Sequence, residues 1–170
     1  YDIYELPPST QGFVALEMLK ILEEVDLASL GHNTPDYLHL LVEAKKLAFA
    51  DRDLYLADRD TMRVRCEDLI SDRRIQMLRG MLHPDQASES IEAVPVEGDT
   101  EYIAVADQEG NCVSFIQSLF MGFGSGIVAE DTGIVLQNRG HLFSLDTNHP
   151  NCIGPHKRCV NTLMPGMVLK

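Results

Sequence analysis

The sequence has few basic residues, and this shortage excludes several classes of partner. Its 170 residues carry 14 Lys and Arg against 26 Asp and Glu, which gives a formal net charge of -12 at pH 7. Proteins that bind nucleic acid or anionic membrane surfaces need clustered basic side chains to neutralise phosphates. We therefore expect neither nucleic acid nor a membrane surface as a partner.

Long apolar runs are also missing. No stretch of 18 apolar residues occurs, so no transmembrane helix is expected. The first residues, Tyr1 to Leu6, have neither the basic region nor the apolar core of a signal peptide. Apolar residues make up 45% and charged residues 24%, which is ordinary for a globular protein, and the length suffices for one domain with its own core.

Motifs that bind metals or form disulfide frameworks are absent as well. The four cysteines stand far apart with no CxxC pair, so a disulfide framework is not expected. The six histidines form no HExxH motif, and no His and Cys residues have the spacing of a zinc site. We expect a protein that holds no metal and no other cofactor.

Helical periodicity is what the first half of the chain does contain. Apolar residues recur at helical spacing over 11–25, with charged residues between them. A second helix is predicted from Pro35, with Thr34 as its N-cap. A third, shorter helix is predicted over 72–82 with Ser71 as its cap.

The pattern changes after a stretch without periodicity. Residues 83–98 contain Pro, Ser and Glu and indicate an exposed, mobile linker. Apolar residues then alternate with period two over 102–106, and 112–118 return after a turn, which predicts a hairpin. Two more strand candidates are 127–129 and 133–136. Because the hairpin is apolar on both sides, we expect a sheet covered on both faces.

Two short segments, Asp51-Arg52-Asp53 and Asp58-Arg59-Asp60, bring carboxylates close together. Such a cluster can bind a cation or supply a carboxylate pair for acid–base chemistry. The interleaved arginines favour ion pairing around the end of the second helix instead.

The glycine-rich segment 122–126 could belong to one of three glycine-containing motifs, but the surrounding residues do not fit any of them. It lacks the Gly-Lys-Ser/Thr of a P-loop, the helix that a dinucleotide fingerprint needs, and the GxSxG pattern of a nucleophile elbow. A tight structural turn is favoured over a backbone loop that contacts substrate.

Several segments together resemble the γ-glutamyltranspeptidase family. No single segment is decisive, but they keep the family's order and spacing over nearly all 170 residues. The segments are Glu5-Leu-Pro-Pro-Ser-Thr-Gln-Gly12, His39-Leu-Leu-Val-Glu-Ala-Lys-Lys-Leu-Ala-Phe-Ala-Asp-Arg52, Gly98-Asp-Thr100 before a strand, Asp107-Gln-Glu-Gly-Asn111, Phe123-Gly-Ser-Gly126, Gly133-Ile134, Asn138 and Gly154-Pro-His-Lys-Arg158.

The resemblance implies an α+β fold, the αββα sandwich of N-terminal-nucleophile (Ntn) hydrolases, of which this chain would hold an incomplete part. It also implies a longer precursor that cleaves itself into a large and a small subunit, with a homo-oligomer possible. Residues 1–99 would be the C-terminal helical part of the large subunit with the processing linker. Residues 100–170 would be the N-terminal β part of the small catalytic subunit. The family's oxyanion-hole glycines would follow Lys170 and an arginine that clamps the substrate carboxylate would precede Tyr1, so these residues alone are expected to have little activity.

Thr100 aligns with the family's nucleophile, so self-cleavage would fall between Asp99 and Thr100. From the residues alone, a threonine at the start of a strand is ordinary. In the family, the freed α-amino group of the nucleophile serves as its base. Ser118 aligns with a hydroxyl residue that hydrogen-bonds the nucleophile. Thr162 aligns with the second of two adjacent serines near the substrate carboxylate, and Asn161 stands in place of the first.

Three positions depart from the family's transpeptidases, which hold the α-amino group of the glutamyl substrate with an Asn, an Asp and a Gln. Here these positions are Phe120, Leu142 and Arg139. An apolar pair does not bind an ammonium group, and an arginine attracts a carboxylate. Arg139, with Asn138 beside it, is therefore predicted to contact substrate.

These departures resemble a sister branch of the family that includes oxamate-amidohydrolase-like and acylase-like enzymes. We predict a self-processing hydrolase that transfers the acyl group of a small-molecule amide to Thr100 and then to water. One alternative is a γ-glutamyltransferase or glutathione hydrolase acting on a γ-glutamyl substrate. Another is a catalytically inactive, truncated relative.

Overall fold

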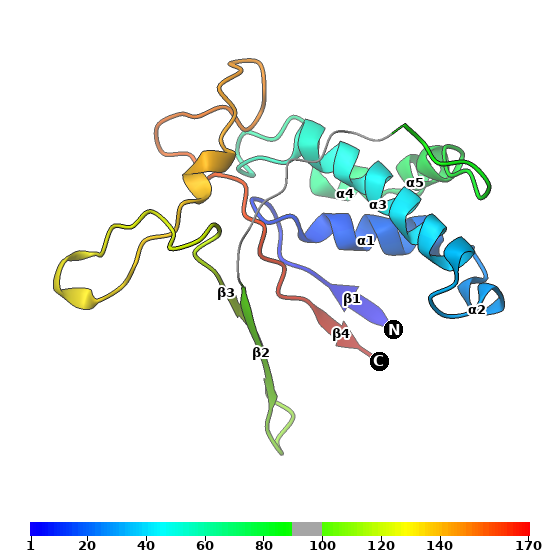
Figure 1. Cartoon of the computed structure of the whole chain (residues 1–170), viewed down its shortest axis with the longest axis horizontal. Helices are drawn as coiled ribbons and strands as arrows, with labels where there is room; N and C mark the ends of the chain where they lie inside the picture. The colour runs from blue at the N-terminus through cyan, green and yellow to red at the C-terminus, as the bar shows by residue number, and fades with distance from the viewer. Residues whose placement is uncertain (90–99) are drawn as a thin grey trace.

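The computed structural model describes residues 1–89 and 100–170 and combines helices with short strands (Figure 1). The α+β character expected from the sequence is confirmed. The elements are, in order, β1 Asp2–Tyr4, α1 Gly12–Leu22, α2 Leu27–Leu30, α3 Pro35–Tyr55, α4 Cys66–Leu69, α5 Asp72–Arg79, β2 Glu101–Ala106, β3 Cys112–Gln117, the 3-10 helices η1 Glu130–Thr132 and η2 Arg139–Leu142, and β4 Met167–Leu169.

Helix α1 packs between α3 and α5 around a small aliphatic core. The buried side chains at this contact come from all three helices and are Ile21, Leu22, Leu40, Ala44, Ile75 and Leu78. Burying each large aliphatic side chain contributes roughly 1.5–3 kcal/mol. Among the helices of the described residues, none is both long and apolar enough to cross a membrane.

The predicted helix starts are confirmed by their caps. The Thr34 hydroxyl accepts a hydrogen bond from the Tyr37 N–H at 3.3 Å, and Pro35 occupies the first turn of α3. The Ser71 hydroxyl accepts one from the Arg74 N–H at 3.4 Å at the start of α5. These acceptors satisfy N–H groups that have no partner inside a helix. The ends are shorter than predicted, because α1 stops at Leu22 and α5 at Arg79.

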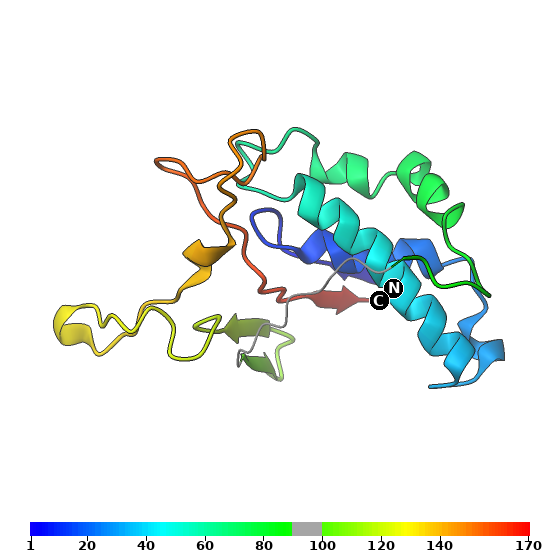
Figure 2. The ribbon, with the colours of Figure 1, turned by 45° about the horizontal axis from the view of Figure 1, so that its top comes forward.

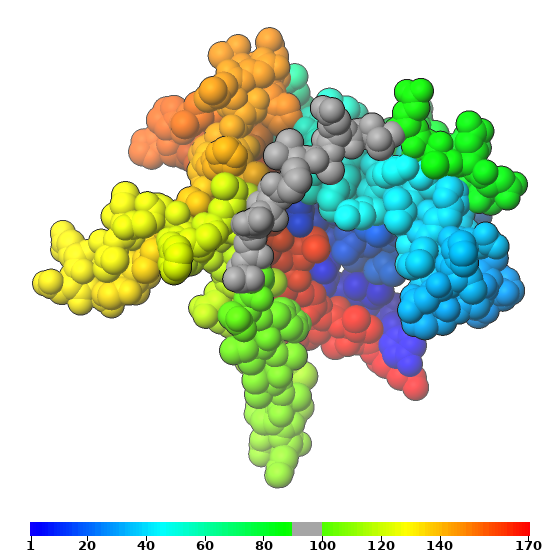
Figure 3. Space-filling view, in the orientation of Figure 1, coloured from blue at the N-terminus to red at the C-terminus, as the bar shows by residue number. Residues whose placement is uncertain are grey.

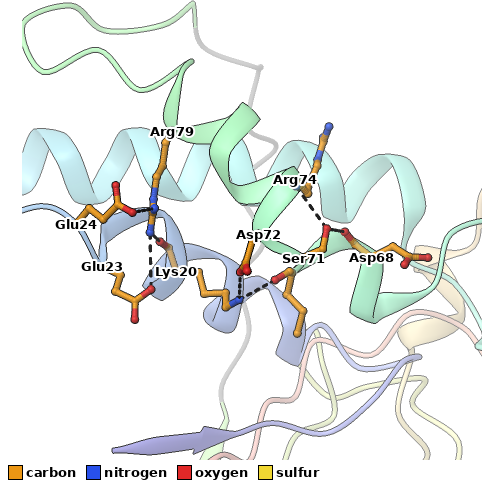
Figure 4. Close-up of polar contacts among 9 residues, drawn as sticks. Lys20, Glu23, Glu24, Asp68, Ser71, Asp72, Arg74 and Arg79 are labelled. Atoms are coloured by element: carbon orange, nitrogen blue, oxygen red, sulfur yellow. Dashed lines mark hydrogen bonds and ion pairs between the residues drawn. The ribbon is translucent and has the colours of Figure 1, made fainter.

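The C-terminal end of α1 is closed by α5, as Figure 4 shows. Arg79 donates to the backbone carbonyls of Lys20 and Ile21 and pairs with Glu24. Lys20 in turn donates to Asp72 at 3.1 Å. A guanidinium at this position satisfies carbonyls that the helix leaves unpaired and complements its negative end.

The expected mobile linker is, in its first part, fastened to α3. Lys46 Nζ donates to the Ser88 carbonyl at 3.0 Å, and the Ser88 N–H donates to the Glu43 carboxylate at 3.0 Å. Burial opposes ionisation of Glu43, but the hydrogen bonds from Lys46 and Ser88 outweigh it and lower its pKa to about 2. Residues up to 89 are therefore exposed but anchored, and the rest of the predicted linker lies outside the described residues.

Main-chain pairing joins the first residues of the chain to the last. Strand β1 pairs antiparallel with β4, with Ile3 opposite Val168 (Figures 1 and 2). Further along, the Gln11 N–H donates to the Asn161 carbonyl at 3.0 Å, and the Asn161 N–H donates to the Ser9 carbonyl at 2.8 Å. Backbone hydrogen bonds thus connect the helical part with the later β part. The domain boundary expected after residue 99 stays a prediction.

The predicted hairpin is confirmed as β2 and β3, whose register runs from Glu101 opposite Gln117 to Ala106 opposite Cys112. Every residue of β2 is exposed, so the expected cover on both faces is not found in the described part of the chain. Figure 3 shows the hairpin projecting from the body as one arm and the segment around residue 130 as another. The alternation of apolar residues correctly predicted the two strands. Covering both faces of the hairpin needs further helices or strands, which the described residues do not place against it.

The two strand candidates at 127–129 and 133–136 were wrong as strands. They meet in a single antiparallel bridge between Val128 and Val135, on either side of η1. Glu130 and Gly133 have φ angles of 41° and 70°, and this left-handed backbone closes the chain into a turn instead of extending a ladder.

A carboxylic acid is buried where α1 crosses α3. Glu17 has no exposed surface, and neither of its side-chain oxygens has a hydrogen-bond partner among the residues described. Asp51 on α3 is buried beside it and is paired with Arg74, whose Nε donates to it at 2.8 Å. Burial, and then the negative charge of Asp51, raise the pKa of Glu17 well above its usual range.

This raised pKa predicts a stability that falls with pH. The unfolded chain loses the Glu17 proton near pH 4.3, whereas the folded chain keeps it, so the folded state loses relative stability as pH rises above that value. In the full-length parent protein, Glu17→Gln is expected to raise the free energy of unfolding at pH 8 by more than about 1 kcal/mol. The gain should shrink toward pH 4, as measured by urea denaturation at both values.

The exposed Glu23→Gln substitution just after α1 is the control and should show no such trend. If Glu17→Gln and the wild type differ in stability by the same amount at pH 4 and pH 8, Glu17 ionises in the folded protein as it does in the unfolded chain.

Candidate active site

A cavity of about 580 Å³ lies where the helical part meets the later loops. Its walls come from the start of α1, the end of α3, the residue before β2, the residue after β3, and the segment 142–162. The lining residues are Gln11, Arg52, Asp53, Leu56, Thr100, Ser118, Phe120, Leu142, Ser144, His149, Asn151, Val160 and Thr162. The cavity therefore brings together three of the predicted site residues, Thr100, Ser118 and Thr162.

Thr100 and Ser118 flank the same end of the hairpin. The last pair of the ladder is Glu101 with Gln117, so Thr100 directly precedes β2 and Ser118 directly follows β3. The Ser118 hydroxyl oxygen also accepts a hydrogen bond from the Phe120 N–H at 2.8 Å. Asp99, the other side of the predicted cleavage site, lies outside the described residues.

Thr162 is held at the cavity by the segment that precedes α1. The Gln11 side-chain amide donates to the Thr162 carbonyl at 3.1 Å. The neighbouring Asn161 uses its side-chain oxygen locally, to accept the Leu163 N–H at 3.0 Å. Asn161 is thus a turn-forming residue in this structure, and its predicted contact with substrate stays a prediction.

The two apolar departures, Phe120 and Leu142, both line the cavity, together with Leu56 and Val160. Phe120 is only 9% exposed and has a φ of 82°, a backbone conformation that side chains larger than glycine rarely adopt. Backbone strain of this kind persists only where the surrounding structure enforces it, and it is concentrated at functional sites. One wall of the cavity can accommodate an apolar group and offers no acceptor to an ammonium ion.

Arg139 lies behind this wall and is not one of the lining residues. It is 3% exposed, its Nη1 donates to the Ser118 carbonyl at 3.0 Å, and its guanidinium carbon is 5.6 Å from the centre of the Phe120 ring. Its Nε and Nη2 have no partner in the part of the chain described. Burial lowers the pKa of the Arg139 guanidinium. The arginine supports the backbone at Ser118, and its predicted contact with a substrate carboxylate stays a prediction.

Asn138 ties together the glycine-rich turn. Its side-chain oxygen accepts the Met121 N–H at 3.0 Å, and its side-chain nitrogen donates to the carbonyls of Met121 and Gly124 at 3.2 and 3.1 Å. Gly124 has a φ of 66°, and a Cβ there would lie 2.6 Å from the Leu136 carbonyl oxygen. The segment is therefore the tight turn favoured above, because its backbone packs too closely for a side chain.

Some residues of the two acidic clusters stabilise the fold, and others line the cavity. Asp51 pairs with Arg74, and the Asp58 carboxylate accepts the backbone N–H of Arg158 at 2.7 Å, so both serve packing. Arg52 and Asp53 instead reach the cavity. Within residues 1–89 and 100–170, no three His, Cys, Asp or Glu side chains come close enough to hold a metal ion.

Sequence reasoning missed His149 and Asn151, which also line the cavity. His149 Nδ1 accepts the Asn151 N–H at 3.0 Å, which leaves Nε2 as the protonated nitrogen that donates to the Asp53 carbonyl at 2.8 Å. The Asn151 side chain is 4% exposed and donates to the Leu142 carbonyl at 2.7 Å. This loop reaches α3 only through the tertiary fold, and no local sequence motif predicts the contact.

The family model described as gamma-glutamyltranspeptidase matches residues 1–170. The chain belongs to the γ-glutamyltranspeptidase family. The resemblance inferred from the sequence is confirmed.

Curated relatives in the family are named as proenzymes of hydrolases. The chain is 46% identical over its whole length to the glutathione hydrolase-like YwrD proenzyme of Bacillus subtilis (strain 168), of which it covers 32%. It is 38% identical, over 96% of its length, to the oxamate amidohydrolase proenzyme of Klebsiella pneumoniae, of which it covers 30%. The chain thus spans about a third of the length of the curated relatives it matches.

A solved structure shares the fold. The cephalosporin acylase from Bacillus halodurans superimposes with a TM-score of 0.83 at 44% identity, over 96% of this chain and 29% of that one. The backbone arrangement described here is therefore also that of a piece of this acylase.

The contacts of Asn138 predict a structural effect for its removal. In the full-length parent protein, Asn138→Ala is expected to lower the free energy of unfolding by about 1 kcal/mol, because it leaves partly buried backbone groups of the turn unpaired. Hydrogen exchange of the amides of residues 121–124 should become faster. Unchanged exchange with a raised KM would show instead that Asn138 acts on the substrate.

Proposed function

We propose that the chain is the central part of a self-processing amide-bond hydrolase with Thr100 as its N-terminal nucleophile. The carrying observation is that Thr100 and Ser118, which flank the two paired strands of a hairpin at the same end, line one cavity in a chain of the γ-glutamyltranspeptidase family. The names of the relatives support a proenzyme that hydrolyses amides. The whole protein would form the αββα sandwich of Ntn hydrolases, with the exposed hairpin in one of its two sheets.

Self-processing begins with the Thr100 hydroxyl. Its oxygen attacks the carbonyl carbon of Asp99, and the Asp99–Thr100 peptide bond breaks as the acyl group moves from nitrogen to oxygen. Water then hydrolyses the resulting ester. The products are a carboxylate on Asp99 and a free α-amino group beside the hydroxyl of Thr100. The precursor would thereby give a large subunit ending at Asp99 and a small subunit beginning at Thr100.

The same residue then turns over substrate. The α-amino group of Thr100, with a usual pKa near 8, takes the hydroxyl proton as the oxygen attacks the amide carbon of the substrate. That proton passes to the leaving amine when the carbon–nitrogen bond breaks, and the acyl group remains as an ester on Thr100. Water hydrolyses the ester and releases the acid. In this proposal Ser118 hydrogen-bonds the nucleophile and Thr162 contacts the substrate, and both line the cavity with Thr100.

The cavity favours an acyl amide over a γ-glutamyl compound. Its apolar wall includes Phe120 and Leu142, which by the family resemblance stand where the transpeptidases hold an ammonium group. A glutathione hydrolase remains the second candidate, because one relative is named glutathione hydrolase-like. Comparing hydrolysis of oxamate and simple acyl amides with that of γ-glutamyl anilides distinguishes the two.

Thr100→Ala in the full-length parent is expected to abolish both processing and turnover, since it removes the attacking oxygen. Intact-mass analysis of the wild type should give two chains meeting at Asp99/Thr100, and the variant should give one. Thr100→Ser, which keeps a hydroxyl, is the matched control and should still be cleaved.

Cleavage at the same bond in Thr100→Ala would refute the assignment of the nucleophile. A wild-type parent that stays whole and hydrolyses no amide would identify a non-catalytic relative with the same fold.

A further inference from the structure

The segment that follows α5 lies against α3 and is fixed there by polar contacts (Figure 2). Residues 83–89 are all exposed, so no apolar side chain of this segment belongs to the core. The His83 carbonyl accepts a hydrogen bond from His39 Nε2 at 2.9 Å, and the Ser88 carbonyl accepts one from Lys46 Nζ at 3.0 Å. The position of the segment therefore depends on hydrogen bonds and not on the burial of apolar surface.

The main attachment of this segment is a buried carboxylate. Glu43 is 4% exposed, and its Oε2 accepts hydrogen bonds from the Ser88 N–H, at 3.0 Å, and from the Ser88 hydroxyl. Its Oε1 accepts one from Lys46 Nζ at 2.7 Å, and the same ammonium group donates to the Ser88 carbonyl. Ser88 thus uses its N–H, its hydroxyl and its carbonyl on one ion pair. We call Glu43, Lys46 and Ser88 the linker anchor.

A buried carboxylate has a cost that its partners must offset. Removing the charge from water disfavours folding unless hydrogen bonds and a counter-charge replace the water. Burial opposes the ionisation of Glu43, but the hydrogen bonds from Lys46 and Ser88 outweigh it and keep its pKa at about 2. The fold therefore holds a buried charge whose partners include an exposed segment outside the core.

The hydrogen bonds give the segment a direction along α3. His39, Glu43 and Lys46 recur at helical spacing, so they lie on one face of the helix. His83 meets the first of them, and Ser88 meets the other two. From residue 83 to residue 88 the chain therefore runs parallel to α3, toward the C-terminal end of the helix.

The C-terminal end of α3 is the end that reaches the candidate active site. Arg52 and Asp53 line the same cavity as Thr100. With the usual helical rise, Arg52 lies about 9 Å beyond Lys46 along the axis. The anchor thus fixes the chain, at a point between α5 and Thr100, on the helix that forms part of the cavity wall.

We propose that the linker anchor positions the Asp99–Thr100 bond for self-cleavage, so that Glu43, Lys46 and Ser88 serve processing and not substrate turnover. This inference rests on the proposed function. In the cleavage step the Thr100 oxygen bonds to the Asp99 carbonyl carbon, the carbon–nitrogen bond breaks, and the hydroxyl proton ends on the freed amine. Such a step is fast only when the reacting atoms are held about 3–3.5 Å apart.

Fixing the chain at Ser88 favours this geometry for two reasons. The entropic cost of bringing two groups together grows with the number of residues between fixed points. Within the described residues, the anchor moves the last fixed point before Thr100 from the end of α5 to Ser88, and it directs the chain toward the cavity. In the mature enzyme Thr100 reacts with a separate substrate molecule, so the anchor has no part in that reaction.

The test separates self-cleavage from turnover in the full-length parent protein. The parent is produced by cell-free translation, samples are stopped at intervals, and the uncleaved fraction is measured by intact mass. Ser88→Ala removes the hydroxyl and should slow cleavage severalfold, whereas Ser88→Thr keeps a hydroxyl and should be cleaved near the wild-type rate. Glu43→Ala removes the whole acceptor and should slow cleavage about tenfold or more.

Turnover and a neighbouring lysine provide the controls. Once cleavage is complete, each variant should hydrolyse the preferred amide of the wild type with unchanged kcat and KM, because no anchor residue is among those that line the cavity. Lys45→Met is the matched control for Lys46→Met. The Lys45 ammonium lies over the Phe49 ring, 4.9 Å from its centre, whereas Lys46 holds Ser88, so only Lys46→Met should slow cleavage.

Wild-type cleavage rates in Ser88→Ala and Glu43→Ala overturn this inference and leave Thr100 as the nucleophile. So does an equal loss of cleavage and of turnover, which would identify an ion pair that only stabilises the fold. If Glu43→Ala does not fold, the two variants of the exposed Ser88 decide. A wild-type parent that is not cleaved before Thr100 instead refutes the proposed function, and with it the role of the anchor.

Discussion

The pairing of residues 9–11 with 161–162 is the contact on which the candidate site depends. It consists of backbone hydrogen bonds between segments far apart in sequence, continued by the Gln11 amide on the Thr162 carbonyl. Through it, the helical part supplies Arg52 and the later part supplies Thr162 to one cavity. Closing a loop of this length has an entropic cost, which these hydrogen bonds and the packing around them must offset.

The cavity has polar and apolar lining residues, and several of the residues that shape it act on the backbone and not on the cavity itself. Asn138 and Arg139 act on backbone, at the glycine turn and at Ser118, and so hold the loop that carries Phe120 in its left-handed conformation. Thr100 depends on the hairpin for its place at the same end as Ser118, because the pair Glu101 and Gln117 lies next to both. The chemistry proposed for Thr100 thus relies on backbone geometry more than on a network of side chains.

Helix caps and the hairpin were predictable from the sequence because each follows from a short-range rule. Thr34 and Ser71 cap their helices because side-chain oxygens at these positions satisfy free N–H groups three residues on. The hairpin followed from period-two alternation. The strands expected at 127–129 and 133–136 failed, because the positive φ of Glu130 and Gly133 overrides the strand preference of their neighbours. The sequence did not predict that Arg52, His149 and Asn151 lie together, since only tertiary packing brings them to one cavity. Thr100 was identified only through the family resemblance.

The pairing of β1 with β4 has a consequence for a chain cleaved between Asp99 and Thr100. If the bond before Thr100 is broken, the two pieces still share a two-stranded sheet and the Gln11–Thr162 contact. Separating them then means breaking the fold itself, so association and folding become one equilibrium. Reassembly from denatured pieces would be second order, with a midpoint that depends on protein concentration, whereas the uncut precursor would refold at a rate independent of it.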